Sequence, residues 1–586
     1  GYKHPAKNKN GLLSFPEPGK IWFGLRRYSL PEMKTVPFPE GYQWDEGMLL
    51  LGEEYCIGGI AAGNGKVYVS NFKLDKLIEF DRDTLKQLRV WGIRNPGRIA
   101  LDGKGSAWIL EHLEPNAIPK GNSSVCRVNL KDASAVIFKL EDVENTSAIA
   151  FDQMGRLLIG DNGADMQVKI YDVSGASPKL VDALGQKGGI YADKPGIAAP
   201  DKLNGITGIG VDSSGNVYVS STRSGGELRK FSQDKKLQWH LMGLAFVDGA
   251  SADPDSPEDV FMKDEHFKMD YSAHPAKWEY VAYTRDIRRP DPFSVQRSKL
   301  ASNLIRRSAG KRFMFCSPMF AQELAIFKFD GEIAVPSGYI GVNDKKIWRD
   351  MNGDGIKDEA ECEEIDPKFL KSSWHWFVDT NGDIWRACND AGIMHIPCQG
   401  LDDKGNPVYE VSKTEIIPMP SPFIEINTVE YIPETDTLYV GGETEMSKRN
   451  KGDGWGPTTR FIARYDNKTK LRWLAPVDTI CCNAISVSSK IVAAVDVRTA
   501  QIQMFDTSTG LKLGTAAAGK PAAHHSGWTD FPRSIRAMTL KNGETVVLVE
   551  EDSCAKIMIY RVKADPRELD RVPLDVDDKG KVNSIK

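Results

Sequence analysis

Short runs of alternating apolar and polar residues recur along the first half of the chain. Each run is interrupted by a turn rich in Asp, Asn and Gly. The clearest examples are residues 58–71, 97–112, 147–162 and 207–222. Two short strands around such a turn predict a tight hairpin. A third amphipathic strand and a fourth follow most of these hairpins, and four short antiparallel strands per unit are typical of a β-propeller blade.

The pattern continues in the second half with longer and more variable connections. Further units are expected at residues 375–390, 427–443, 483–497 and 533–552. Residues 311–338 fit a degenerate blade. The sequence therefore predicts an all-β fold, a single β-propeller of about eight four-stranded blades (seven to nine), with loop insertions and one EF-hand-like calcium loop.

This repeat register predicts the domain organisation. Residues 20–33 could pair with the C-terminal blade and close the ring, which would remove exposed sheet edges. Residues 243–310 break the rhythm with Pro, Asp and aromatic residues and are expected to form an insertion. The expected segments are an N-terminal extension at 1–45, regular blades at 46–242, the insertion at 243–310, a degenerate blade with the calcium loop at 311–371, further blades at 372–565 and a C-terminal tail at 566–586.

The first four units resemble NHL-like β-propellers, most clearly through GIGVDSSGNVYVSSTRSGGELRKF. The segments IFKFDGEIAVPSG and HIPCQGLDDKGNPVY are also similar to uncharacterised secreted bacterial propeller proteins. The resemblance implies the fold and leaves activity open, because one propeller scaffold supports many functions.

The stretch DMNGDGIKDEAE has the spacing of a calcium-binding loop. Oxygen ligands at positions 1, 3, 5, 7, 9 and 12 can wrap a hard cation, with Gly355 at position 6 allowing the sharp turn. The expected ligands are Asp350, Asn352, Asp354, the carbonyl of Ile356, Asp358 and Glu361. The alternative is a solvated acidic turn. Since the flanks lack the two helices of an EF-hand, we expect a structural calcium clip.

Propeller geometry predicts where a binding face lies. Residues just before the innermost strand of each blade, and residues after its second strand, share one face near the central channel. Arginines, amides and carboxylates there would suit a sugar acid or oligosaccharide, although polar loop residues are often merely solvated. The candidate ligand-binding residues are Arg98, Asp161, Asn162, Arg223, Arg386, Asn389, Glu443, Asp496, Arg498, Trp528, Arg533 and Glu550.

Two clusters are candidates for acid-base chemistry, because each places a histidine near a carboxylate. One is Glu111 with His112. The other, within residues 522–538, contains His524, His525 and Asp530, with Trp528 as a platform for a sugar ring. Neighbouring histidines on an extended segment point in opposite directions, so at most one of that pair is expected to serve the site. His375, between two tryptophans, is expected to be a packed residue.

Composition and net charge limit the kinds of binding partner that we expect. Apolar residues make up 41% and charged residues 27%, and the formal charge of -4 gives no global attraction to nucleic acid or anionic lipid. No stretch has the roughly 18 to 20 apolar residues of a membrane helix. Arg285, Arg288 and Arg289 alternate with acidic residues, which indicates a salt-bridged surface. A calcium clip suits a calcium-rich medium, so we expect a secreted or periplasmic protein whose signal peptide is absent from this chain.

Three functions stay open from the sequence. The first is a propeller that binds an acidic polysaccharide or another polar ligand and, if it is an enzyme, acts as a polysaccharide lyase or glycoside hydrolase. The second is a non-catalytic scaffold for a protein or cell-surface partner. The third is a quinone-dependent dehydrogenase-like propeller, suggested by the adjacent Cys481 and Cys482 among nine cysteines.

Overall fold

The computed structural model is all-β, with strands, one-turn 3-10 helices and no α-helix among the residues that it describes. This confirms the predicted fold class. The described residues are 2–3, 21–37, 49–53, 55–112, 123–223, 225–244, 249–293, 300, 302–318, 321–370, 373, 375–447, 458–479, 482, 484–496, 501–517, 535–551, 556–562, 574–576 and 582–585.

The chain divides into two compact units. The first unit consists of residues 1–192 and 199–243, and the second consists of residues 193–198 and 244–586. Each unit is built from antiparallel sheets in which strands consecutive in the chain are neighbours. Sheets of this kind are propeller blades, so the chain is a β-propeller-like protein.

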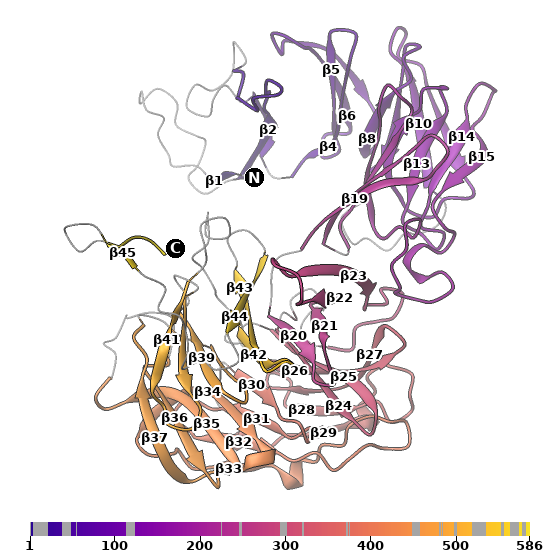
Figure 1. Ribbon diagram of the computed structural model, residues 1–586. Coiled ribbons are helices and arrows are strands. Elements are labelled where there is room, and N and C mark those ends of the chain that lie inside the picture. The colour runs from indigo at the N-terminus through magenta and orange to yellow at the C-terminus, as the bar shows by residue number, and fades with distance from the viewer. Residues whose placement is uncertain are drawn as a thin grey trace. The chain divides into compact units, whose positions relative to one another are not determined.

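The first unit contains four four-stranded sheets (Figure 1). Their first strands, β4, β8, β12 and β16, contact one another in chain order. The sheets consist of β4 (Ile57–Gly63), β5 (Lys66–Asn71), β6 (Lys76–Asp81) and β7 (Gln87–Gly92); β8 (Pro96–Leu101), β9 (Ser106–Glu111), β10 (Ser123–Asn129) and β11 (Ala135–Leu140); β12 (Thr146–Phe151), β13 (Leu157–Asp161), β14 (Val168–Asp172) and β15 (Lys179–Leu184); and β16 (Ile206–Val211), β17 (Val217–Ser221), β18 (Gly226–Phe231) and β19 (Leu237–Gly243).

A smaller sheet of β1 (Tyr2–Lys3), β2 (Ile21–Leu25) and β3 (Leu49–Glu53) also belongs to the first unit. The β2 strand pairs with β1 on one side and with β3 on the other. Both edges of β2 are therefore taken, which differs from the predicted pairing of residues 20–33 with the C-terminal blade. Leu25 instead packs against Val69 and Phe80 of the first blade.

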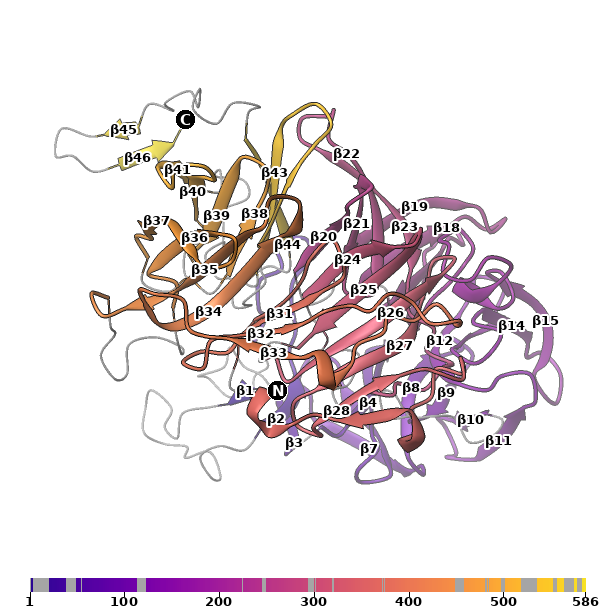
Figure 2. The ribbon, with the colours of Figure 1, turned by 90° about the horizontal axis from the view of Figure 1, so that it is seen from below.

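The second unit contains six sheets (Figures 1 and 2). They consist of β20 (Ala250–Asp253), β21 (Ser256–Met262), β22 (Glu265–Asp270) and β23 (Lys277–Tyr283); β24 (Ser302–Ser308), β25 (Lys311–Ser317), β26 (Glu323–Asp330), β27 (Ile333–Gly341), β28 (Lys346–Arg349) and β29 (Cys362–Glu364); β30 (His375–Val378), β31 (Ile384–Ala387), β32 (Ile393–Ile396) and β33 (Glu415–Ile417); β34 (Phe423–Ile432), β35 (Thr437–Thr444), β36 (Phe461–Asp466) and β37 (Lys470–Pro476); β38 (Ala484–Val487), β39 (Ile491–Val495), β40 (Ile502–Asp506) and β41 (Lys512–Ala516); and β42 (Ile535–Thr539), β43 (Thr545–Glu551) and β44 (Lys556–Val562). A separate hairpin pairs β45 (Leu574–Val576) with β46 (Val582–Ile585).

These six sheets close on one another. The first strands contact in the order β20, β24, β30, β34, β38 and β42, and β42 in turn contacts β20. The arrangement differs from the predicted single ring of about eight blades, because six sheets already complete a ring within the second unit. It also differs at residues 243–310, where the predicted insertion contains the four-stranded sheet β20–β23.

Apolar side chains fill the spaces between neighbouring sheets. Leu158 and Val168 of the third sheet pack against Ile206 and Val219 of the fourth. In the second unit, Trp376 belongs to a large cluster that joins β30–β33 to the sheets on either side. Burying one such side chain contributes about 1.5–3 kcal/mol, so these interfaces hold the blades together.

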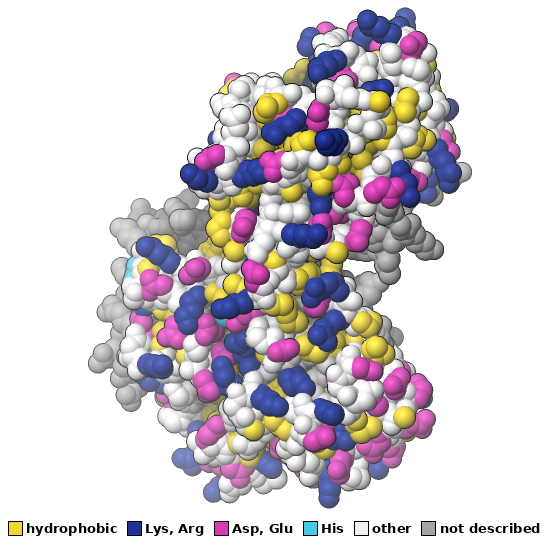
Figure 3. Space-filling model, turned by 90° about the vertical axis from the view of Figure 1, so that its right-hand side faces the viewer, with side chains coloured by type: hydrophobic (Ala, Val, Ile, Leu, Met, Phe, Trp, Pro, Cys, Tyr) yellow, Lys and Arg dark blue, Asp and Glu magenta, His cyan; other side chains and the backbone are white. Residues whose placement is uncertain are grey.

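On the face shown in Figure 3, Lys and Arg side chains are interspersed with Asp and Glu. The described part of the chain has no helix with the length and apolar character needed to span a membrane.

Candidate functional site

A polar cavity of about 290 Å³ lies in the first unit, where its four blades meet; we call it the inner-strand pocket. Residues from all four sheets line it. Five of them are predicted site residues: Arg98, Glu111, His112, Asn162 and Arg223. The pocket therefore brings together the sequence candidates from the second, third and fourth sheets.

The repeat register explains this convergence. Arg98 lies at the start of β8, an innermost strand, whereas Glu111 ends β9 and His112 follows it. Asn162 follows β13 and Arg223 follows β17, which are the second strands of their sheets. Antiparallel pairing places the start of a first strand beside the end of its second strand, so these positions share one end of each sheet.

Glycines make room for the closely spaced backbones at this end. A Cβ atom added to Gly97 would lie 3.0 Å from Cα of His112. Gly205 has a φ of +73°, and a Cβ atom there would lie 2.4 Å from Cγ of Arg223. The aliphatic part of Arg223 therefore packs on the bare backbone of Gly205, which fixes where its side chain enters the pocket.

Two side chains in the pocket are available to a ligand. Arg98 and Glu111 are exposed and form no hydrogen bond or ion pair with the described residues. Arg98 thus offers a guanidinium group whose donors are not already used. A guanidinium can bind a carboxylate through two parallel hydrogen bonds, so this arrangement suits an anionic ligand.

Aromatic rings form one wall of the pocket. The His112 ring stacks on Phe72, with ring centroids 3.8 Å apart and planes 6° apart. The Tyr55 ring centroid lies 5.7 Å from the His112 ring centroid, and Tyr55 is 41% exposed. The exposed Tyr55 ring can act as a platform for a flat apolar face such as that of a sugar.

Asp161 and Asn162 have structural contacts, although both are sequence candidates for ligand binding. The Asn162 side chain accepts from the Ile206 N–H at 2.7 Å and donates to the Ile206 carbonyl at 2.8 Å. Asp161 accepts from the backbone N–H groups of Asn145 at 3.1 Å and Gly163 at 2.9 Å. Burial raises the pKa of Asp161, although these backbone bonds oppose the shift. Both residues shape the pocket through the backbone.

The described candidates in the second unit are each held by local contacts. Arg386 is buried with its guanidinium carbon 4.8 Å from the Trp376 ring centroid. Glu443 accepts from Thr458 N–H at 3.1 Å, and Asp496 accepts from the Thr479 hydroxyl. Asn389 joins a β-bridge with Ile426, and Glu550 is fully buried. His375 is also fully buried, which agrees with the prediction of a packed residue.

The remaining candidates lie outside the described residues. They are Arg498, His524, His525, Trp528, Asp530 and Arg533. Cys481 is also outside, so the adjacent-cysteine prediction stays a prediction.

The proposed calcium ligands lie in the loop between β28 and β29, so strands flank the loop in place of EF-hand helices. Asp350 is 2% exposed and accepts from Gly353 N–H at 2.9 Å and Gly355 N–H at 3.2 Å. Glu361 accepts from Asn352 N–H and from Trp348 Nε1, each at 2.9 Å. Asp354 accepts from Ile356 N–H at 2.7 Å, while Ile356 and Asp358 complete the predicted set.

The carboxylates of this loop lie close enough to affect one another's ionisation. Burial raises the pKa of Asp350, and the charges of Glu361 and Asp354 raise it further against the lowering effect of the backbone bonds. Oxygen donors of this kind are the ones that calcium prefers. The described residues nevertheless contain no group of three or more His, Cys, Asp or Glu side chains placed to hold a metal ion. Binding would therefore require these carboxylates to draw closer together.

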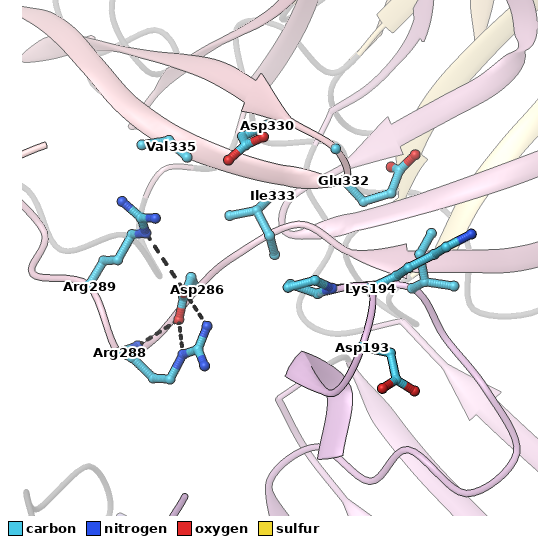
Figure 4. Close-up of a pocket in the computed structure, with 12 residues that line it drawn as sticks. Asp193, Lys194, Asp286, Arg288, Arg289, Asp330, Glu332, Ile333 and Val335 are labelled. Atoms are coloured by element: carbon cyan, nitrogen blue, oxygen red, sulfur yellow. Dashed lines mark hydrogen bonds and ion pairs between the residues drawn. The ribbon is translucent and has the colours of Figure 1, made fainter. Parts of the chain in front are cut away.

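A second surface cavity, of about 490 Å³, lies in the second unit and is shown in Figure 4. Its charges are largely satisfied internally. Arg288 binds Asp286 through Nε and Nη2, both at 2.8 Å, and Arg289 Nε lies 3.6 Å from Asp286. Arg285 pairs with Asp291 at 2.8 Å. These pairs confirm the predicted salt-bridged surface and make this cavity a weaker candidate for an anionic ligand.

A third cavity, of about 580 Å³, is lined by all six first strands of the second unit; we call it the axial cavity. Its lining includes Arg306 and Arg536, which were not candidates from the sequence. Both lie within first strands, where apolar residues are expected. A charged residue at such a position was the signal that could have identified them.

The fold and the inner-strand pocket define a propeller-like protein with a polar cavity in its first unit. No protein-family model matches the chain, and no curated protein matches it in sequence. Among solved structures, the chain is similar to selenomethionine-substituted virginiamycin B lyase from Staphylococcus aureus, with 9% sequence identity, a TM-score of 0.23, and coverage of 47% of this chain and 82% of that chain. This likeness is too distant to bear on substrate or activity.

Proposed function

We propose that the first unit binds an acidic saccharide in the inner-strand pocket. The observation that supports this most directly is the presence of Arg98 and Arg223, from different blades, in one cavity with the exposed Tyr55 ring. Uronate sugars combine a carboxylate with hydroxyl groups and an apolar ring face, so they match all three features.

The arginines supply most of the expected affinity. Hydrogen bonds to charged groups are worth about 1.5–3 kcal/mol, which corresponds to roughly ten-fold or more in the dissociation constant. Arg98 is the principal ligand in this proposal because its donors are not engaged by the described residues. Glu111 lies at the same rim and orients the saccharide by accepting from its hydroxyl groups.

Turnover is a second candidate function. His112 lies in the pocket next to Glu111, and a histidine near a carboxylate can transfer a proton in a lyase or hydrolase reaction. The stacking of His112 on Phe72 would hold the imidazole in one orientation. A non-catalytic scaffold would use the same pocket for the glycan of a cell-surface partner.

Calorimetric titration of the full chain with polygalacturonate, alginate and a neutral glucan tests the proposal. We expect binding of an acidic polymer and none of the neutral glucan, with loss of binding in Arg98→Ala. Arg94→Ala is the matched control, because Arg94 is exposed in the same unit but does not line the pocket. New unsaturated or reducing ends would establish turnover, whereas binding without product would favour the scaffold.

We further propose that the loop at residues 350–361 binds calcium as a structural clip. Support comes from the ligand spacing and from the contacts that tie the loop to the following sheet. Asn406, which is fully buried, donates to the Asp350 carbonyl and accepts from Ser337 Oγ at 2.8 Å. A cation bound in this loop would hold β28, β29 and the hydrogen bonds of Asn406 in place. A calcium clip would suit a secreted or periplasmic location.

A further inference from the structure

The axial cavity of the second unit has a distinctive charged wall. Arg306 from β24, Glu430 from β34 and Arg536 from β42 all line it. Asp253, also in the lining, is bound by Arg307 through Nε at 2.8 Å and Nη2 at 2.6 Å, so its charge is compensated. The lining also contains Arg464, which donates to Asp466 at 3.0 Å, and Glu434, which accepts from the Thr380 hydroxyl at 2.6 Å. Arg306, Arg536 and Glu430 are the other charged residues of this wall.

Arg536 has unused donors in this wall. The side chain is only 8% exposed, and Nη1 donates to the Ile535 carbonyl at 2.8 Å. Its Nε and Nη2 are buried without a hydrogen-bond partner among the described residues. Glu430 does not fill this role, since its Oε1 lies 3.9 Å from Nη1 and its Oε2 accepts from Val487 N–H at 2.8 Å. Leaving such donors unsatisfied is costly, which points to a missing acceptor.

The same molecule shows what the Nε and Nη2 pair of an arginine binds. In Arg307 this pair holds the Asp253 carboxylate, and in Arg288 it holds the Asp286 carboxylate at 2.8 Å from each nitrogen. These two N–H groups are parallel and match the two oxygens of one carboxylate. In Arg536 no acidic side chain of the described residues occupies this fork, and the residue belongs to the lining of the axial cavity.

Arg306 adds positive charge beside this fork. Its Nε donates to the carbonyls of Val378 at 2.6 Å and Asp379 at 3.0 Å, which fixes the guanidinium against β30. Burial, together with the charge of Arg536, lowers the pKa of Arg306 to about 10. Arg306 remains charged at neutral pH. An anion between the two arginines would relieve their repulsion.

We propose that the axial cavity binds a small carboxylate anion, held bidentately by Nε and Nη2 of Arg536 and electrostatically by Arg306. The site is independent of the inner-strand pocket, since it lies in the other unit and uses none of the same residues. The Ser486 hydroxyl, also in the lining, accepts from Ala537 N–H at 3.0 Å and can donate its proton to a further oxygen of the anion.

Calorimetric titration of the full chain carrying Arg98→Ala and Arg223→Ala tests this site alone, with malonate as the probe. We expect saturable binding at one site. Adding Arg536→Lys keeps the positive charge but removes the fork, and should weaken binding by about ten-fold or more. Adding Glu430→Gln removes the nearby anion and should tighten binding. Arg288→Lys is the control, because its fork is occupied by Asp286 outside the axial cavity.

Each outcome bears on the proposal. If malonate does not bind to the Arg98→Ala, Arg223→Ala protein, ordered water satisfies Arg536 and the proposal is wrong. Binding that survives Arg536→Lys unchanged would also overturn it, as would binding of inorganic phosphate without binding of malonate. Because Arg536→Lys could impair folding, the opposite effect expected for Glu430→Gln provides an independent check in a variant that keeps the fork.

Discussion

The side-chain amide of Asn162 forms two hydrogen bonds with the backbone of Ile206, accepting from its N–H at 2.7 Å and donating to its carbonyl at 2.8 Å. Asn162 follows the second strand of the third blade, and Ile206 begins the first strand of the fourth. The amide thus imitates a β-ladder pair between blades. Both residues line the inner-strand pocket, so these two bonds hold part of its wall in place.

Replacing Asn162 with Ala should destabilise the first unit by about 1–3 kcal/mol, because both backbone groups of the buried Ile206 lose their partner. Urea unfolding monitored by circular dichroism measures the change. Gln153→Ala is the matched control, since Gln153 also bonds across blades, to the Asp212 carbonyl at 3.0 Å, but is exposed. Equal losses in the two variants would contradict the account.

Gly205→Ala should weaken ligand binding in the same direction as Arg223→Ala. The added methyl would overlap Cγ of Arg223, and the φ of +73° disfavours any side chain. Gly226→Ala is the control, because a Cβ atom there meets nothing within 4 Å. Calorimetry with an acidic oligosaccharide compares them. Unchanged affinity in Gly205→Ala would show that the position of Arg223 does not matter.

Much of the first unit could be predicted from the sequence, because its hairpins keep a regular register. That register correctly grouped Arg98, Glu111, His112, Asn162 and Arg223 at one end of the sheets. It could not show that the Asn162 amide is used by Ile206, because this contact joins residues far apart in the chain. Side-chain hydrogen bonds to a neighbouring blade leave no periodic signal.

The second unit was harder to predict. The strand β21 contains Pro257 and two acidic residues, which are typical of loops. The pairing of β20 with β21 is irregular between Ala252 and Asp253, close to where this proline lies, so the strand tolerates it. Ring closure by β42 and β20 depends on contacts between distant residues, which a single sequence does not reveal.

His395 should make stability depend on pH. Burial alone would lower its pKa, but Asp383 at 3.0 Å and Glu415 at 2.9 Å outweigh burial and raise it. A raised folded-state pKa stabilises the protein below the unfolded value of about 6.5, and this stabilisation is lost as pH rises through the folded-state pKa. Asp383, whose pKa is lowered despite burial, contributes above about pH 4.

The free energy of unfolding of His395→Gln should therefore be about 1–2 kcal/mol below that of the wild type near pH 5.5, and the difference should be smaller near pH 8.5. Urea unfolding at both pH values gives the difference. Comparing the two proteins cancels the contribution of Asp379, whose pKa is raised to about 6 by burial and by the charge of Asp383. A loss that is independent of pH would contradict the raised pKa of His395.

Calcium should raise the melting temperature, and a chelator should reverse the effect. Free calcium at 100 times its dissociation constant would stabilise the folded state by about 2.7 kcal/mol. Glu361→Gln should abolish the response, whereas Asp403→Asn, at an exposed acid outside the loop, should keep it. Differential scanning calorimetry with calcium and with chelator measures the shift. An unchanged melting temperature in the wild type would show that the loop is a solvated turn.

The central claim is that the inner-strand pocket binds an acidic saccharide through its arginines. Calorimetric titration of wild-type, Arg98→Ala and Arg94→Ala proteins with an acidic oligosaccharide tests it most directly. The account predicts binding by the wild type and Arg94→Ala and a loss of about ten-fold or more in Arg98→Ala. Equal affinities in the wild type and Arg98→Ala, or no binding of any acidic saccharide, would contradict it.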